Sequence, residues 1–105
     1  ESEDVIVFHD DLDINFGKIK AKFGGSSAGH NGIESIDNFI GKDYSRVRIG
    51  IGIGNGKTNV TDHVLKDFDE EEKIKLENIT NNITDSLSIL LDKKLELFSS
   101  TINNK

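Results

Sequence analysis

Three stretches in the first half of the chain have the hydrophobic pattern of β-strands. Residues 5–8 are consecutively apolar and lead into the acidic segment 9–13, which predicts a buried strand that delivers carboxylates to its C-terminal end. Residues 18–23 alternate strictly between basic and apolar positions, and residues 46–53 alternate between apolar and basic or glycine positions. Because successive side chains of a strand point to opposite faces, each alternating segment is expected to bury one face and expose the other.

The outward faces of the two alternating strands carry positive charge. In the first strand these positions are Lys18, Lys20 and Lys22, and in the second they are Arg46, Arg48, Gly50 and Gly52. One such strand usually carries only solvated charges, but two in a small domain favour an anion-binding surface. The two glycines are expected to leave a bare backbone surface beside the arginines.

A glycine-rich loop and a short helix connect these two strands. Residues 24–32 include four glycines and three Ser or Ala residues, which indicates a loop that needs positive φ angles or a close backbone approach. Ile33, Ile36 and Ile40 then follow at helical spacing, and Gly41 is the expected C-terminal stop. Asn31 lies where this helix begins and, from its residue type alone, is interpreted as the N-cap.

The last third of the chain has the pattern of amphipathic helices. Residues 69–72 form an acidic first turn, and two apolar stripes at intervals of three and four follow: Leu76, Ile79, Ile83, Leu87 and Leu90, then Leu91, Leu95, Phe98 and Ile102. One long helix or two consecutive helices are expected to pack on the sheet through these stripes. The fold class is therefore α/β, with strands and the glycine-rich loop over about residues 4–56 and helices over about 61–102.

Composition narrows the chemistry that the chain can perform. Its 105 residues fit one domain, and the absence of cysteine excludes disulfides, thiolate metal sites and cysteine nucleophiles. His9, His30 and His63 are spaced too irregularly to indicate a zinc site. No run is long enough to predict a membrane span. Methionine is also absent, so we expect that N-terminal sequence is missing.

The net charge of −6 conceals a basic middle third. Residues 17–66 contain eight Lys or Arg against four Asp or Glu, whereas the segments on either side are acidic. Charge asymmetry of this kind matters more to a polyanionic partner than the total does. Residues 50–58 fit neither a dinucleotide fingerprint nor a phosphate-binding P-loop, because the glycine spacing fails for both.

Several of these segments together resemble the bacterial-type peptidyl-tRNA hydrolases, in the family's own order. Residues 9–13 are similar to its H-D-E-L-D segment, 18–22 to its K-x-K strand, 25–33 to its G-x-x-x-G-H-N-G-L loop, 44–52 to its R-x-R-x-G-I-G strand and 60–65 to its V-x-x-[FYH]-V-L segment. Asp11 replaces the commoner Glu, and Glu34 replaces a basic residue. The family's N-terminal half carries a G-N-P-G turn, the catalytic histidine of an H-N-x-G segment and one substrate-binding asparagine. None of these has a match here, so the likeness is to a C-terminal part.

The resemblance implies a three-layer fold, with a twisted mixed β-sheet flanked by helices, and hydrolysis of the ester between peptide and tRNA. Asp10 matches the aspartate that orients and stabilises the basic form of the catalytic histidine, which lies outside this chain. Asn31 matches a substrate-binding asparagine, and His30 is interpreted first as a structural bridge between loop and strand and then as a substrate contact. Candidate tRNA phosphate contacts are Lys20, Lys22 and Arg48, with Lys18 and Arg46 in support.

The same resemblance implies tRNA as partner, no cofactor or metal, a monomer and a cytoplasmic location. Two other functions stay open. One is a noncatalytic RNA-binding relative of the organellar splicing-factor type, and retention of Asp10 and Asn31 favours the enzyme over it. The other is a nucleotide-binding domain that uses residues 54–58, which the failed motif spacing disfavours.

Overall fold

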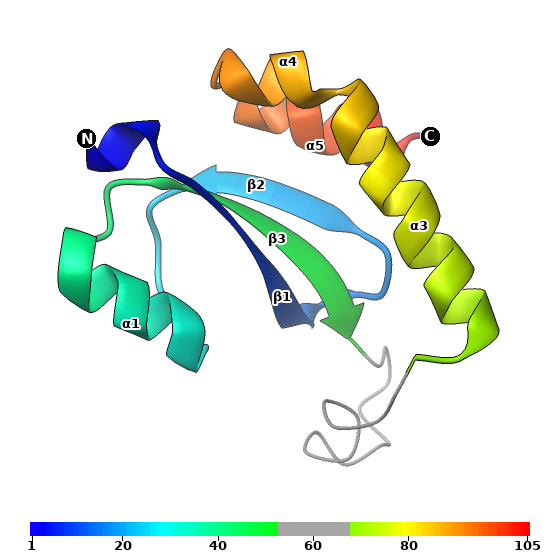
Figure 1. The fold of residues 1–105 in the computed structure, drawn as a ribbon, viewed down its shortest axis with the longest axis horizontal. Helices are drawn as coiled ribbons and strands as arrows, with labels where there is room; N and C mark the ends of the chain where they lie inside the picture. Colours follow the sequence, from blue (N-terminus) through cyan, green and yellow to red (C-terminus); the bar gives the residue numbers. More distant parts are fainter. Residues whose placement is uncertain (53–67) are drawn as a thin grey trace.

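A computed structural model of the chain describes residues 1–52 and 68–105 (Figure 1). After a 3₁₀ helix at Ser2–Asp4, the elements are β1 (Ile6–Asn15), β2 (Ile19–Phe23), α1 (Asn31–Ile40), β3 (Ser45–Gly52), α3 (Glu70–Asp85), α4 (Leu87–Leu91) and α5 (Leu95–Asn103). His63 and the segments 54–58 and 60–65 lie outside the described residues, as does the predicted inward position Ile53.

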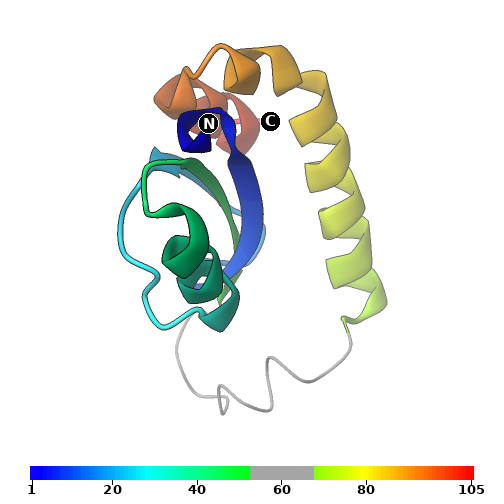
Figure 2. The same cartoon turned by 60° about the vertical axis from the view of Figure 1, so that its left-hand side comes forward.

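The three strands form one twisted mixed sheet in the order β1-β3-β2 (Figure 1). β3 is central, parallel to β1 and antiparallel to β2. α1 lies on one side of the sheet and α3, α4 and α5 lie on the other, as the two views in Figures 1 and 2 agree. The prediction of an α/β, three-layer mixed sheet flanked by helices is confirmed.

The hydrophobic core lies between the sheet and the C-terminal helices. Its buried members are Ile19, Ala21 and Val47 from the strands and Ile79, Leu90, Phe98 and Ile102 from the helices. The predicted inward positions Ile19, Ala21 and Val47 and most of the two helical stripes are therefore confirmed. Phe23, predicted on the same inward face, is 47% exposed at the end of β2, and the prediction of a buried first strand is wrong, because no residue of β1 is buried. No described residue of α1 belongs to this core cluster.

Two positions of the helical stripes were predicted as core and are not. Leu87 and Leu91 are 41% and 62% exposed. The chain forms three helices rather than one or two, because α3 ends at Asp85 and Lys93 adopts a left-handed φ of 61° after α4. Each break rotates the following helix relative to the previous one, so the 3.6-residue periodicity does not continue through it.

Side chains of α5 satisfy the outer edge of β2. The side-chain oxygen of Asn103 accepts the backbone N–H of Ile19 at 2.8 Å, and its amide donates to the Ile19 carbonyl at 2.7 Å. The hydroxyl of Ser99 accepts the N–H of Ala21 at 2.8 Å. An edge strand with unpaired backbone groups invites pairing with another chain, and these bonds occupy such groups at Ile19 and Ala21.

The start of α3 explains the acidic segment at 69–72. Asp69 is the N-cap and accepts the N–H of Glu72 at 2.8 Å, while the Glu72 carboxylate accepts the N–H of Asp69 at 3.0 Å. This reciprocal pair is a capping box, which satisfies two backbone donors that a helix start otherwise leaves free.

The prediction that Arg46, Gly50 and Gly52 of β3 face solvent is wrong, because other parts of the chain cover them. Arg46 is only 2% exposed, and Gly50 and Gly52 are both buried. β1 continues past its apolar start to Asn15 and crosses directly over the two glycines, so that a Cβ at Gly52 would lie 2.6 Å from the carbonyl oxygen of Ile14. Alternation identifies which positions share a face, but it does not identify what lies over that face.

This close approach makes Gly50 a sensitive position. A Cβ there would collide with the backbone carbonyl of Asn15, and backbone cannot move aside as a side chain can. Gly50→Ala is expected to lower the free energy of unfolding by about 3 kcal/mol or more, at the upper part of the range for overpacking. Chemical denaturation measures this change.

Gly29→Ala is the matched control for that measurement. A Cβ at Gly29 would have no atom within 4 Å, and the φ of +80° leaves only the left-handed backbone penalty, roughly 1–2 kcal/mol. Equal destabilisation by the two substitutions would show that β1 does not cross at contact distance over Gly50.

Candidate functional site

Polar side chains of β1 and of the glycine-rich loop line a small open cavity. The cavity has a volume of about 150 Å³, and its lining residues are His9, Asp10, Asp11, Leu12 and Asp13 from β1 and Ser27, Ala28 and His30 from the loop. The sequence predicted acids at the C-terminal end of a strand beside such a site. The structure places them there, although β1 runs on through them rather than ending at Phe8.

His30 connects the start of α1 to β1. It is the N-cap of α1, and its Nδ1 accepts the backbone N–H of Ile33 at 3.2 Å. Its Nε2 lies 2.7 Å from Oδ1 of Asp10. The predicted bridge between loop and strand is therefore present, whereas the N-cap assigned to Asn31 is wrong, because the chain turns into the helix one residue earlier.

The two bonds of His30 assign its proton. The Ile33 N–H can only donate, so Nδ1 must act as an acceptor, and the neutral ring then carries its hydrogen on Nε2 and donates it to Asp10. Both ring nitrogens are thus engaged. A general base needs a nitrogen lone pair that is free to take a proton, and His30 has none in this arrangement.

Asp10 retains an unused oxygen. Its side chain is 52% exposed, and Oδ1 is the atom bound by His30. Within the described residues, Oδ2 has no hydrogen-bond partner. A carboxylate held at one oxygen and open at the other is arranged to accept a second donor from the cavity side.

His9 contacts both members of this pair. Its Nδ1 donates to the backbone carbonyl of Asp10 at 2.8 Å, and its ring meets that of His30 edge to face, with centroids 5.1 Å apart. Burial lowers the pKa of His9 below its ordinary value, and the bond to the Asp10 carbonyl only partly opposes this effect. The ring is therefore kept neutral and serves as packing for His30.

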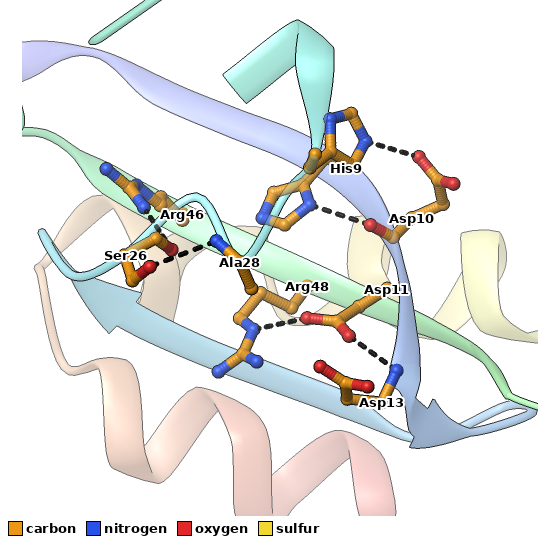
Figure 3. A network of polar contacts seen from close by, with 9 residues as sticks. His9, Asp10, Asp11, Asp13, Ser26, Ala28, Arg46 and Arg48 are labelled. Carbon is orange, nitrogen blue, oxygen red and sulfur yellow. Dashed lines mark hydrogen bonds and ion pairs between the residues drawn. The ribbon is translucent and has the colours of Figure 1, made fainter. Parts of the chain in front are cut away.

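Asp11 and Arg48 form an ion pair beside the cavity. The Nε of Arg48 donates to Oδ2 of Asp11 at 2.7 Å, with side chains 24% and 8% exposed (Figure 3). Burial alone would raise the pKa of Asp11, but the bonds from Arg48 and from the Asp13 backbone N–H outweigh it and hold the pKa below its ordinary value. Arg48 is thereby fixed through one nitrogen, and this partnership was not predicted from the sequence.

The basic residues of β2 and β3 lie side by side in the sheet. Lys20 lies directly opposite Arg48, and Lys22 lies opposite Arg46. Like charges at opposed positions repel unless a counter-charge separates them. Both arginines pair with carboxylates, whereas Lys20 and Lys22 are exposed, with no ion pair to another described residue. The lysines therefore present the unneutralised charge of this surface.

A second cavity of about 160 Å³ adjoins the first on the basic side. Its lining residues are His9, Asp11, Lys22, Gly24, Gly25, Ser26, Ser27, Ala28, Arg46 and Arg48. Arg46 was predicted as a supporting phosphate contact, and this prediction is wrong because its side chain is 3% exposed and bonded to Asp37 at 2.9 Å. Lys22 and Arg48 are the members that an anion could reach.

Asn31 is not brought into the first cavity. It is the first residue of α1 and is exposed, next to His30 but absent from the residues that line the cavity. Its side chain is therefore available to a ligand that extends along the helix start, where free backbone N–H groups also point outward.

The described residues, 1–52 and 68–105, offer neither a metal site nor a membrane span. No group of three or more His, Cys, Asp or Glu side chains there could hold a metal ion. No helix in that part of the chain has both the length and the apolar character to cross a membrane.

Comparisons with known proteins point to one family. The family model described as peptidyl-tRNA hydrolase matches residues 1–105. The chain is 76% identical over 105 residues to a peptidyl-tRNA hydrolase of Pelagibacter ubique and 45% identical over 98 residues to one of Rickettsia bellii. A crystal structure of peptidyl-tRNA hydrolase from Acinetobacter baumannii superposes with a TM-score of 0.76 at 33% identity.

The matches cover most of this chain but only part of each relative. The Pelagibacter match takes in all of this chain and 56% of the relative, and the Rickettsia match 93% and 53%. The Acinetobacter structure is matched over 93% of this chain and 50% of its own. The chain thus spans about half the length of these relatives, and on the whole-chain match it belongs to the peptidyl-tRNA hydrolase family.

Proposed function

We propose that the complete protein hydrolyses the ester bond between peptide and tRNA in peptidyl-tRNA and so recycles tRNA from stalled translation. The observation that carries the proposal is the Asp10 carboxylate, which is held at the cavity by His30 and has its second oxygen open. This is the arrangement that a histidine general base requires of its carboxylate partner.

The reaction is attack of water on a carbonyl ester, which needs a base for the water proton. A histidine suits this task near neutral pH. His30 is engaged at both nitrogens, and the Nε2 atom of His9 is buried. The family's H-N-x-G segment has no match in residues 1–105, and the sequence around His63 does not fit it either. The base is therefore a histidine from outside these residues, whose ring N–H donates to Oδ2 of Asp10. The carboxylate then fixes the ring tautomer and stabilises the imidazolium that forms as the proton moves.

Asn31 positions the substrate beside this base. An amide can donate to a carbonyl oxygen and accept from water or a substrate N–H at the same time. Its exposed place at the start of α1, next to His30, lets it hold the peptide or the terminal ribose at the edge of the cavity. Holding both reactants in place lowers the entropic part of the barrier.

The tRNA backbone binds to the basic surface of β2 and β3. Lys20 and Lys22 supply exposed charge. Among the described residues Arg48 is bonded through Nε alone, to Asp11, which leaves its two terminal nitrogens for a phosphate. Contacts to phosphates carry no sequence information, which suits an enzyme that accepts many tRNAs.

The proposed substrate also suggests where and in what form the protein acts. Peptidyl-tRNA is produced by ribosomes, so we expect the protein to act in the cytoplasm, as a monomer and without a cofactor. The noncatalytic RNA-binding alternative would need the basic surface alone. It would have no use for a carboxylate held by a histidine at a cavity, and the relatives named above all carry the enzyme's name.

The first test removes the charge of Asp10. In Asp10→Asn the amide oxygen can still accept from His30, but an N–H then faces the incoming histidine and favours the wrong tautomer. We expect kcat on peptidyl-tRNA to fall by about 10²-fold or more, below the roughly 10⁴-fold of a serine-protease triad because water is the nucleophile here. KM should change little, because the phosphate contacts remain.

Asp13→Asn is the control for that test. It removes an equal charge from the same cavity, and no hydrogen bond joins its carboxylate to either described histidine. A much smaller loss is expected. Activity of folded Asp10→Asn within a few-fold of wild type would remove Asp10 from the mechanism. The 105 residues alone are expected to show no turnover.

The second test reverses the charge of Lys20 or Lys22. Arg48→Glu is less informative, because it would leave Asp11 without its partner at 8% exposure. Lys22→Glu should weaken tRNA binding and reduce the slope of log K against log salt by about one unit for each phosphate that is no longer bound. Hydrolysis of a short ester that lacks tRNA should be unaffected.

Lys94→Glu, at an exposed position before α5, is the matched control. It changes the net charge equally but lies on a different layer of the fold. Equal weakening by Lys22→Glu and Lys94→Glu would indicate a general electrostatic effect and would contradict a binding surface on β2.

A further inference from the structure

Arg46 is a buried cation that the proposed mechanism does not use. Its side chain is 3% exposed and that of Asp37 is 8% exposed, and the two are joined by a 2.9 Å bond from Nη2 to Oδ1. The guanidinium carbon lies 4.8 Å from the centroid of the Tyr44 ring, and the Tyr44 hydroxyl donates to the same Asp37 oxygen at 2.7 Å. Burial and this bond raise the pKa of Tyr44, so the hydroxyl remains a donor.

The two terminal nitrogens of Arg46 hold different parts of the chain. While Nη2 binds Asp37 in the middle of α1, Nη1 donates to the backbone carbonyl of Ser26 in the glycine-rich loop at 3.0 Å (Figure 3). Ser26 is four residues before His30, and Asp37 is seven residues after it. One guanidinium on the central strand therefore fixes the backbone on both sides of His30.

Short bonds carry this restraint from Ser26 to the cavity. The Ser26 hydroxyl accepts the N–H of Ala28 at 3.0 Å, and the carbonyl of Ser27 accepts the N–H of His30 at 2.9 Å. His30 then donates to Asp10. The loop contains left-handed residues, Ala28 among them, so it has no regular secondary structure of its own to set its course.

Stability alone is a weak explanation for this buried pair. Replacing a buried ion pair by apolar side chains of similar volume is often neutral or stabilising, whereas a planar guanidinium can bind two acceptors in a fixed geometry. Ile33, in the first turn, is the buried apolar residue of α1, whereas the middle of the helix is joined to β3 by the bond from Arg46 to Asp37. This directional bond adds to the packing of Ile33 and restrains the helix at a second point.

We propose that Arg46 is a positioning residue for the hydrolysis reaction, which sets the place of His30, and through it of Asp10, by holding Ser26 and Asp37 together. The inference rests on the proposed function. It predicts that a lysine at this position, which keeps the charge but cannot span both acceptors, disturbs the cavity and leaves the tRNA surface on β2 in place.

Steady-state kinetics of Arg46→Lys in the complete protein test the proposal, with peptidyl-tRNA as substrate. We expect kcat to fall by about 10- to 100-fold, the size of effect that a displacement of about 1 Å produces, while KM stays within a few-fold of wild type. Amide hydrogen exchange gives a second readout that does not depend on activity. Exchange of the Ile33 amide hydrogen, which is donated to Nδ1 of His30, should become faster.

Tyr44→Phe is the matched control. It removes one hydrogen bond to the same Asp37 oxygen and leaves both bonds of the guanidinium in place. It should lower Tm without changing kcat or exchange at Ile33. A folded Arg46→Lys variant with wild-type kcat and wild-type exchange at Ile33 would overturn the proposal, as would an equal fall of kcat in Tyr44→Phe.

Asp37→Asn is the alternative test variant if Arg46→Lys does not fold. It keeps the shape of the acceptor, weakens the bonds that Asp37 accepts from Arg46 and Tyr44, and leaves the bond from Arg46 to Ser26 in place. Because Tyr44→Phe reports the effect of the tyrosine bond alone, kcat should fall several-fold at unchanged KM in Asp37→Asn only, and wild-type kcat there would overturn the proposal. A wild-type protein without hydrolase activity would refute the proposed function instead. The exchange measurement would then still decide whether Arg46 positions His30.

Discussion

The hydrogen bond between His30 and Asp10 is the interaction on which the rest of the site depends. It joins the strand β1 to a glycine-rich loop and the first turn of α1. It also divides the carboxylate of Asp10 into an oxygen that is committed and an oxygen that is open. A base supplied from elsewhere can therefore meet a carboxylate that is already oriented, so little reorganisation is needed during the reaction.

The fold was predictable wherever one residue pattern determined one environment. Alternation identified β2, and the stop at Gly41 identified the end of α1. The exposed faces were less predictable, because they depend on what lies over them. Arg46 is buried under α1 and the loop, and Gly50 is covered by the end of β1. The local sequence around Arg46 or Gly50 does not predict this burial.

The candidate site divides in the same way. The acids at the end of the first strand and the lysines of β2 were visible in the sequence, and the resemblance supplied the role of Asp10. The cap at His30 was missed because histidine is an uncommon N-cap, and Asn31 beside it fits the usual preference. The pairing of Asp11 with Arg48 joins residues 37 positions apart, so it follows from the strand register and from no local signal.

The most direct test of the His30–Asp10 arrangement is the protonation pattern of the two histidines, measured by long-range ¹H–¹⁵N NMR correlation of the imidazole rings in the folded protein. We expect a neutral His30 with its hydrogen on Nε2, because Ile33 donates to Nδ1, and a neutral His9 with its hydrogen on Nδ1. A His30 ring with its hydrogen on Nδ1, or one that averages between tautomers, would contradict this arrangement. Such a ring would have a nitrogen free to act as base, and Asp10 would not be held for a second histidine.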